Sequence, residues 1–356
     1  MGLSSICIHS SRFRNREKYC LGCGNGEQSR PAIMERIYAL IFVSTCLLYV
    51  YPGARAIGIN YGLLGDNLPP PANVISLLKQ RNVPKIRIFE PNQDVLTALH
   101  NSGVSVIIGT RNEDLQPLAS NPSAAANWVQ TNVIPHYTSV NIKCIAAGNE
   151  VYPDNLAQYI PGAMQNLDSA LSASKISIPV STAVSMVVLS NSNPPSQGAF
   201  QPVMTQITNL LASKNSPLLV NVYPYYAGGE LSYALFKDNA TAFRDNQLTY
   251  RNMFDAMVDA VYAALEKVGG SQIEIVVTET GWPSDGGRDA SIENAQTYVN
   301  NLIKHVSSGQ GTPRKPGKDI DTYIFAMFNE DLKHEGIERH WGLYYPNLTE
   351  VYHANL

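Results

Sequence analysis

The chain has 356 residues, of which 44% are hydrophobic and only 15% are charged, so it can bury a large core. This length allows two small domains or one barrel of eight strand–helix units, which needs about 250 residues. The net charge is −3, and it becomes −7 without residues 1–56, which leaves 19 basic and 26 acidic residues. An acidic chain is not expected to bind nucleic acid or an anionic membrane through its bulk charge.

The N-terminal part of the chain has the features of a secretory signal peptide. The tripeptide MER at 34–36 precedes an apolar run over 37–50, and ARA at 54–56 supplies an A-x-A cleavage site. This run is too short and wrongly flanked for a stable membrane span, although a single membrane anchor is the alternative. We therefore expect a signal peptide over 34–56 and a mature form without a membrane anchor. An upstream start codon or a second targeting signal would explain the extension at 1–33.

The cysteines and the glycosylation motifs agree with a secreted chain. Only Cys144 remains after residue 57, so no intramolecular disulfide is expected there, and its apolar surroundings predict a buried thiol. Two N-x-[ST] sequons begin at Asn239 and Asn347. The C-terminus shows neither a hydrophobic tail for a GPI anchor nor much that could serve as a vacuolar propeptide. These features favour the extracellular space over the vacuole.

From residue 57 onward, apolar runs of strand length alternate with segments of helical period. Strands are expected at 56–61, 85–89, 104–109, 142–148, 178–183, 217–223, 273–279 and 322–328. Helices are expected at 73–81, 93–100, 123–137, 156–171, 200–212, 253–268 and 290–306. Eight such alternations without a long break predict an α/β fold, a single (β/α)8 TIM barrel over 57–356. The alternative is an open doubly wound sheet, but Gly58 and Gly62 do not provide its usual G-x-G-x-x-G turn.

Two glutamates follow directly after predicted strands. Glu279 ends an apolar run and precedes a Gly-Trp-Pro turn, and Glu150 follows the fourth strand. In a barrel, both positions lie on the rim where active sites form. Two carboxyl groups about 5 Å apart can cleave a glycosidic bond with retention, one donating a proton and the other attacking the anomeric carbon. A helix cap or a rim salt bridge is the alternative for either glutamate alone, but the pair favours catalysis.

Residues beside the two glutamates are suited to binding a sugar. Asn149 precedes Glu150 and is a natural hydrogen-bond donor to a sugar 2-hydroxyl. Trp282, Tyr223, Tyr225 and Tyr226 offer flat apolar faces for pyranose rings. Core packing is the alternative for these aromatic side chains, and the position of Trp282 beside the catalytic turn favours the groove.

Five motifs of the chain resemble the plant β-1,3-glucanases, family 17 of the glycoside hydrolases. They are IGINYG (57–62), AAGNE (146–150), VNVYPYY (220–226), VVTETGWP (276–283) and FAMFNEDLK (325–333). The likeness runs from Ile57 to about Tyr352. It implies a (β/α)8 barrel that hydrolyses β-1,3-glucan internally with retention, without a metal or cofactor. It also implies Glu150 as general acid/base and Glu279 as nucleophile.

The resemblance also implies supporting roles for other charged and aromatic residues. Glu330 and Lys333 match further positions of the family's cleft, and Glu338 is a candidate for another. We expect Glu330 and Lys333 to help keep the two catalytic carboxyls in opposite protonation states, with a solvated surface charge as the alternative for Lys333. Tyr61 is a candidate hydrogen-bond partner of the nucleophile, with a rim aromatic as the alternative.

Three positions depart from the family's usual pattern. Asn60 stands where Cys is more frequent, FEP at 89–91 where Tyr-Asp-Pro is common, and GTRN at 109–112 where Gly-Val-Pro-Asn is usual. None of them alters the two catalytic glutamates. Glu90 and Arg111 are expected to change contacts at the rim or the preferred glucan.

The sequence therefore predicts a secreted endo-β-1,3-glucanase that acts as a monomer on callose, fungal wall glucan or laminarin, with a role in defence or in the cell wall. An extended polysaccharide requires an open groove rather than a closed pocket. A mixed-linkage β-1,3-1,4-glucanase on the same scaffold is one alternative. A wall glucan-binding protein without turnover is another, and the presence of both glutamates argues against it.

Overall fold

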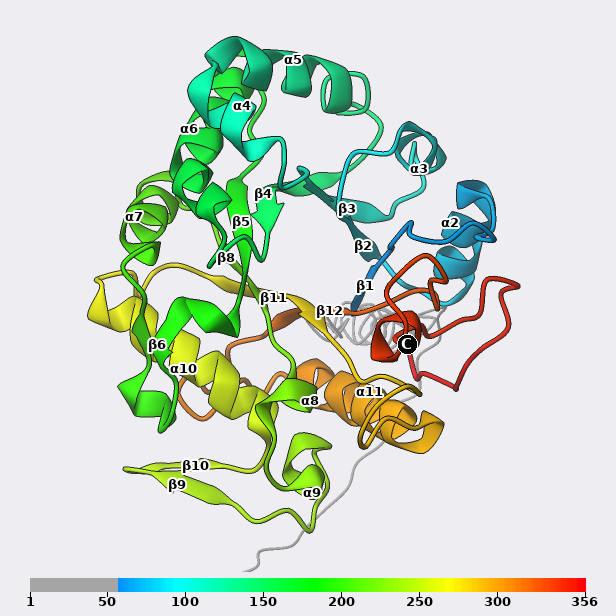
Figure 1. The fold of residues 1–356 in the computed structure, drawn as a ribbon, viewed down its shortest axis with the longest axis vertical. Helices are drawn as coiled ribbons and strands as arrows, with labels where there is room; N and C mark the ends of the chain where they lie inside the picture. The colour runs from blue at the N-terminus through cyan, green and yellow to red at the C-terminus, as the bar shows by residue number, and fades with distance from the viewer. Residues whose placement is uncertain (1–56) are drawn as a thin grey trace, which may run out of the picture. The chain divides into compact units, whose positions relative to one another are not determined.

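A closed barrel of parallel strands forms the centre of the structure, a computed structural model that describes residues 57–356 (Figure 1). The predicted signal peptide and N-terminal extension lie outside the described residues. Around the barrel the strands follow the order β1-β12-β11-β8-β5-β4-β3-β2. Their bounds are β1 (Gly58–Asn60), β2 (Lys85–Ile88), β3 (Ser105–Gly109), β4 (Ile142–Asn149), β5 (Val180–Ser185), β8 (Leu218–Asn221), β11 (Ile275–Thr280) and β12 (Asp321–Ile324). The predicted barrel is confirmed, and the open doubly wound sheet is excluded.

The seven predicted helices surround the barrel (Figure 1). They are α2 (Pro71–Gln80), α3 (Gln93–Ala98), α5 (Pro122–Asn132), α6 (Ile160–Ala173), α7 (Met204–Lys214), α10 (Met253–Lys267) and α11 (Ile292–Ser307). Several begin at a side-chain cap: Asn92 accepts from the Val95 amide, and Asn252 accepts from the Asp255 amide. No helix between residues 57 and 356 is long and apolar enough to cross a membrane.

Short elements that the sequence did not predict lie in the loops at the carboxyl ends of the strands or close to them. They are α4 (Leu115–Ser120), α8 (Pro224–Ala227), α9 (Leu231–Ala234), the hairpins β6 (Leu189–Asn191) with β7 (Ala199–Phe200) and β9 (Phe243–Asp245) with β10 (Leu248–Tyr250), and the 3-10 turns η1 (Asn155–Tyr159), η2 (Met186–Val188), η3 (Pro195–Gln197) and η4 (Ile337–Arg339). The segment between β8 and α10, for which the sequence predicted neither a helix nor a strand after residue 223, thus contains α8, α9 and a hairpin. Elements of two to six residues are too short to show a hydrophobic period.

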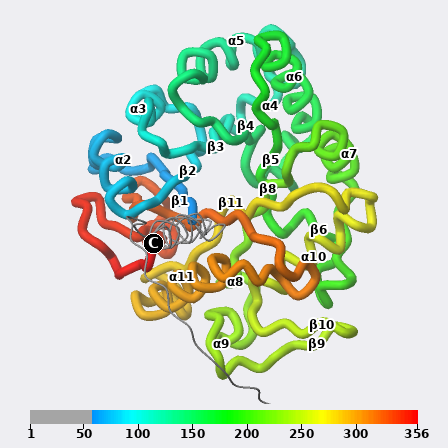
Figure 2. The backbone as a smooth tube through the Cα atoms, turned by 180° about the vertical axis from the view of Figure 1, so that it is seen from behind, coloured from blue at the N-terminus to red at the C-terminus, as the bar shows by residue number. Residues whose placement is uncertain are grey.

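The interior of the barrel is closed by packed side chains. One cluster comprises Ile107, Cys144, Ala146, Ala183, Leu219 and Tyr323. Cys144 is a free, buried thiol, as predicted, and burial raises its pKa to about 12. The C-terminal segment returns to the side of the barrel beside α2 (Figure 2), where Arg81 pairs with Glu350 and donates to the Ala354 carbonyl.

Candidate active site

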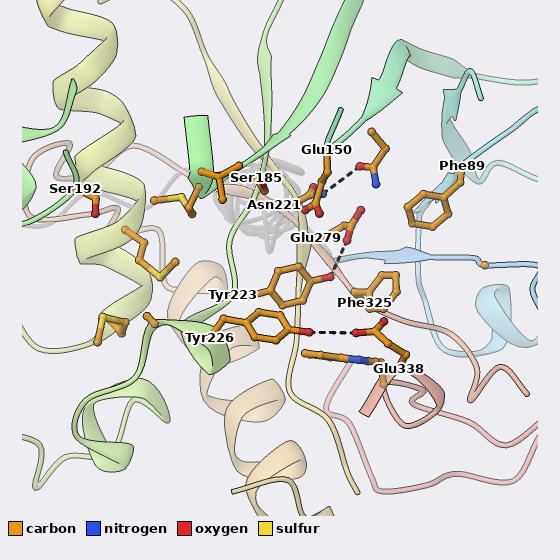
Figure 3. A pocket seen from close by; sticks show the side chains of 18 of the residues that line it. Phe89, Glu150, Ser185, Ser192, Asn221, Tyr223, Tyr226, Glu279, Phe325 and Glu338 are labelled. Atoms are coloured by element: carbon orange, nitrogen blue, oxygen red, sulfur yellow. Dashed lines mark hydrogen bonds between the residues drawn. The ribbon is translucent and has the colours of Figure 1, made fainter. Parts of the chain in front are cut away.

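A cleft of about 1390 Å³ lies over the carboxyl ends of the barrel strands. Each of the eight strands contributes to its lining, at its last residues or in the loop that follows. One lining residue from each strand or its loop, in chain order, is Tyr61, Glu90, Thr110, Glu150, Ser185, Tyr223, Glu279 and Phe325. Both predicted catalytic glutamates are therefore in one cleft, and Figure 3 shows them close together near its centre.

Irregular backbone directs both glutamates into the cleft. The pairing of β4 with β5 shifts register between Ala146 and Asn149, and the pairing of β11 with β8 shifts between Val277 and Glu279. Glu150 then adopts a left-handed conformation with φ of 51°, and its amide donates to the Ala183 carbonyl at 2.9 Å. Register shifts of this kind re-aim side chains, and they are frequent next to active sites.

The Glu279 carboxylate receives two hydrogen bonds from buried donors. Arg87 Nη1 donates to Oε1 at 2.7 Å, and the Tyr223 hydroxyl donates to Oε2 at 2.7 Å. Burial and the charge of Glu279 raise the pKa of Tyr223 well above its ordinary value, so the phenol keeps its proton and remains a donor. The two contacts hold both oxygens of the carboxylate in place, and an ionised carboxylate is the form that attacks carbon.

Glu150 has a different environment. Burial raises its pKa above the ordinary value for glutamate, and the charge of Glu279 raises it further. A hydrogen bond from Asn221 Nδ2 to Glu150 Oε1, 2.8 Å long, and the charge of Arg87 oppose this shift without cancelling it. The two carboxyl groups are therefore held in unequal environments, which is how paired carboxyls divide into an acid and a nucleophile.

Asn149 shares its hydrogen-bond partners with the two glutamates, and its side-chain amide is fixed by them. Its Oδ1 accepts from Arg87 Nη2 at 2.7 Å and from Asn221 Nδ2 at 3.1 Å. Asn112 holds its backbone from both sides, accepting from the Asn149 amide at 2.8 Å and donating to the Asn149 carbonyl at 2.9 Å. Asn149 Nδ2 makes no hydrogen bond to the part of the chain that the structure describes, so it can donate to a ligand.

Glu330 and Lys333 both line the cleft but pair with each other. Lys333 Nζ lies 3.1 Å from Glu330 Oε2 and 4.1 Å from the centre of the Phe325 ring. Glu330 Oε1 also accepts from the Leu64 amide at 2.8 Å. The Lys333 side chain is only 13% exposed, which argues against a solvated surface charge. The cation that directly contacts Glu279 is Arg87, so a role of Glu330 and Lys333 in catalysis stays a prediction.

Glu338 reaches the cleft from η4. Its Oε1 accepts from the Tyr226 hydroxyl at 3.2 Å, a bond that Figure 3 shows beside the catalytic pair. Its charge contributes to the raised pKa of Glu150. This position is compatible with the substrate contact predicted for Glu338.

Trp282 does not line the cleft, so the sequence prediction for it is wrong. The side chain is 3% exposed, packs against the Tyr225 and Tyr298 rings at 5.1 and 5.6 Å, and donates through Nε1 to the Asp289 carbonyl. Trp341 lines the cleft instead, with its ring centre 5.2 Å from that of Tyr223. A single tryptophan outside any predicted strand was the only signal for Trp341 in the sequence.

Tyr61 lines the cleft but is not the tyrosine that bonds the nucleophile. It is 1% exposed, its ring meets that of Phe328 edge-on at 6.1 Å, and burial raises its pKa to about 12. Tyr223 makes the bond to Glu279 that was predicted for Tyr61. Tyr61 is the rim aromatic that the sequence allowed as the alternative.

Arg87 and Asn221 are the functional residues that sequence analysis missed. Arg87 is fully buried, yet it belongs to β2, whose residues Ile86 and Ile88 are apolar. The signal in the sequence was a basic residue that alternates with isoleucines inside a predicted strand, on the opposite face from them. Within residues 57–356, no group of three or more His, Cys, Asp and Glu side chains is arranged to hold a metal ion.

A (β/α)8 barrel with two unequal glutamates in a cleft at its carboxyl rim defines a glycoside hydrolase. The family model for "Glycosyl hydrolases family 17" matches residues 57–356, and the chain belongs to this family. A Nicotiana tabacum protein named "Glucan endo-1,3-beta-glucosidase, acidic isoform GI9" is 46% identical over 319 residues, covering 85% of this chain and 92% of its own.

Two solved structures share the whole barrel. One is described as "CJP38, a beta-1,3-glucanase and allergen of Cryptomeria japonica pollen", with 46% identity, a TM-score of 0.82 and coverage of 84% of this chain and 98% of that one. The other is described by the words "two plant beta-glucan endohydrolases with distinct substrate specificities", with 41% identity, a TM-score of 0.81 and coverage of 84% and 100%.

Proposed function

We propose that this chain is a secreted endo-β-1,3-glucanase that retains the anomeric configuration, with Glu279 as nucleophile and Glu150 as general acid/base. The observation that carries the proposal is the unequal environment of the two carboxyls. Glu279 accepts hydrogen bonds from Arg87 and Tyr223, whereas the pKa of Glu150 is raised by burial and by the charge of Glu279. The relatives named as β-1,3-glucanases support the substrate class.

The reaction has two steps. In the first, a Glu279 oxygen bonds to the anomeric carbon while the bond to the leaving sugar oxygen breaks, and Glu150 gives that oxygen its proton. In the second, the Glu150 carboxylate takes a proton from water, the water oxygen bonds to the anomeric carbon, and the bond to Glu279 breaks. Asn149 Nδ2 would donate to the sugar 2-hydroxyl in both steps.

The charges of the cleft favour a neutral polymer. Its lining holds seven glutamates but only two basic residues, Arg111 and Lys333. Each of these is in an ion pair with a lining glutamate, Glu90 or Glu330. No cation among the lining residues is left to attract an acidic polysaccharide, and an uncharged glucan does not require one.

The sharpest test uses azide as an external nucleophile with a β-1,3-linked disaccharide that carries a dinitrophenyl leaving group. Glu279→Ala should lose at least about a thousandfold of kcat and recover with azide, giving the α-glycosyl azide. Glu150→Ala should instead give the β-glycosyl azide, because the glycosyl-enzyme still forms. Glu335→Gln, an exposed glutamate outside the cleft lining, is the control. Rescue of both variants with the same anomer would overturn the assignment.

Hydrolysis of mixed-linkage β-1,3-1,4-glucan is the second candidate. One solved structure similar to this chain is described as one of two plant β-glucan endohydrolases with distinct substrate specificities, which supports weighing a second substrate. Comparing kcat/KM on laminarin and on barley-type mixed glucan distinguishes the two candidates. Laminarin binding without release of reducing ends would instead indicate a glucan-binding protein without turnover.

We also propose that the mature chain works as a monomer outside the cell, on callose or fungal wall glucan, with a role in defence or in the wall. The asparagines of both sequons, Asn239 and Asn347, are exposed and so accessible to glycosylation. Expression in plant cells with recovery from the apoplastic fluid tests the compartment. A mass decrease on deglycosylation, lost in the Asn239→Gln and Asn347→Gln variants, tests the glycans, and light scattering tests the monomer.

A further inference from the structure

The wall of the cleft carries an ion pair that the catalytic network does not use. Glu90 follows β2, Arg111 follows β3, and Arg111 Nε donates to Glu90 Oε2. Both residues line the cleft, and their side chains are 38% and 54% exposed. An ion pair this exposed contributes little to stability, because solvent screens it and both side chains lose freedom to form it. Structural support is therefore a weak explanation for the pair.

The ion pair leaves hydrogen-bonding atoms of both side chains free to bind a ligand. Within residues 57–356, Arg111 Nη1 and Nη2 and Glu90 Oε1 make no hydrogen bond to protein. The other cleft pair differs, because Glu330 and Lys333 are nearly buried and Glu330 Oε1 is already occupied by the Leu64 amide. A sugar hydroxyl both donates and accepts, so neighbouring hydroxyls match a guanidinium donor beside a carboxylate acceptor.

Neighbouring residues fix the ion pair close to the catalytic network. Phe89, next to Glu90, lies under the Arg87 guanidinium at 4.7 Å from its ring centre. Asn112, next to Arg111, holds the Asn149 backbone through both atoms of its amide. The two loops are thus held at the residues next to Glu90 and Arg111, so the ion pair stands on an ordered base.

We propose that Glu90 and Arg111 form a sugar-binding subsite on this wall, which hydrogen-bonds the hydroxyls of a neutral glucosyl unit beyond the two that the cleaved bond joins. The subsite makes affinity depend on chain length, and it rests on the proposed glucanase function. The Glu90 carboxylate neutralises the positive charge of Arg111. The subsite therefore favours neutral hydroxyl groups over an anionic substituent.

The test measures kcat and KM on β-1,3-gluco-oligosaccharides of increasing length for Glu90→Gln, Arg111→Gln and the double variant. KM for the longest substrates should rise about tenfold in each single variant, since charge-assisted hydrogen bonds are lost. KM for the shortest cleaved substrate and every kcat should stay within about twofold. The double variant should cost little more than either single one, because the two side chains act on the same unit.

Lys318→Gln is the matched control, because Lys318 pairs with Glu274 at 2.8 Å in a partly exposed position outside the cleft lining. An unchanged KM at all lengths in an active Arg111→Gln enzyme would overturn the subsite while leaving the glucanase function intact. A kcat loss that is equal at all lengths would also overturn it, because the pair would then position Asn149. A wild type that cleaves no β-1,3-oligosaccharide would overturn the proposed function, and the subsite with it.

Discussion

Arg87 Nη1 lies 2.7 Å from Glu279 Oε1 inside the barrel, and the two side chains are only 1% and 7% exposed. The residues come from β2 and β11, which are not neighbours in the sheet. A buried carboxylate without a partner is costly, and Arg87 supplies that partner to Glu279. Because Arg87 Nη2 also bonds Asn149, one side chain ties Glu279 to the residue beside Glu150.

Replacing Arg87 should damage stability and turnover together. Arg87→Met leaves Glu279 buried and unpaired, so the free energy of unfolding should fall by about 3–5 kcal/mol. We expect kcat to fall by at least about a hundredfold, because the nucleophile loses its fixed partner. Urea unfolding and initial rates on laminarin measure the two effects. Glu279→Gln added to Arg87→Met should recover part of the stability, and a single variant with wild-type kcat would contradict this role.

Glu338 should set part of the pH dependence of the reaction. Its charge raises the pKa of Glu150, so Glu338→Gln should lower that pKa. Glu150 would then lose its proton at a lower pH, and the basic limb of the kcat/KM profile should move to lower pH. The glutamine oxygen can still accept from Tyr226, so the geometry is kept. Glu335→Gln serves as control, and a limb that stays in place or moves upward would refute the coupling.

Two tryptophans should separate stability from substrate binding. Trp282→Phe removes the indole bond to the Asp289 carbonyl, so the free energy of unfolding should fall by about 1–3 kcal/mol while KM on laminarin stays unchanged. Trp341→Phe shortens a side chain that lines the cleft, so KM should rise severalfold. Unfolding curves and Michaelis plots of both variants are the measurements. A KM increase for Trp282→Phe alone would return that residue to the groove.

The pair of His100 and His136 should make the protein less stable in acid. His136 Nε2 lies 2.9 Å from Gln93 Oε1, which can only accept, so Nδ1 of His136 accepts from His100 Nε2 at 2.8 Å. A proton on His136 Nδ1 would prevent that atom from accepting the bond. Burial and His100 lower the pKa of His136 below its ordinary value of 6.5, so the unfolded chain binds this proton first. Stability is therefore lost as the pH falls below 6.5, until the folded protein also binds the proton.

The measurement for this pair is the free energy of unfolding at pH 8 and pH 5. The loss between the two pH values should be smaller in His136→Gln than in the wild type. His334→Gln, an exposed histidine, should show the wild-type loss. An equal loss in wild type and His136→Gln would show that other groups govern the acid sensitivity.

The sequence by itself determined the barrel and the position of its two glutamates. Eight apolar runs separated by helical segments permit few arrangements, because parallel strands need crossover helices. Glu150 and Glu279 each end such a run, and the closed barrel places all these ends on one rim. The position of a residue along its strand is enough to locate it on the rim. A pair of carboxyl groups on one rim could therefore be predicted from the sequence.

Only the tertiary structure decided which side chains meet across the barrel. Arg87 belongs to β2, in which basic and apolar residues alternate, and nothing local indicates that its partner is on β11. Tyr223, rather than Tyr61, bonds the nucleophile because the chain after β8 turns that hydroxyl toward Glu279. Trp282 follows the nucleophile by three residues yet packs into the core. Side-chain direction depends on register shifts and turns at the strand ends, and no hydrophobic period encodes them.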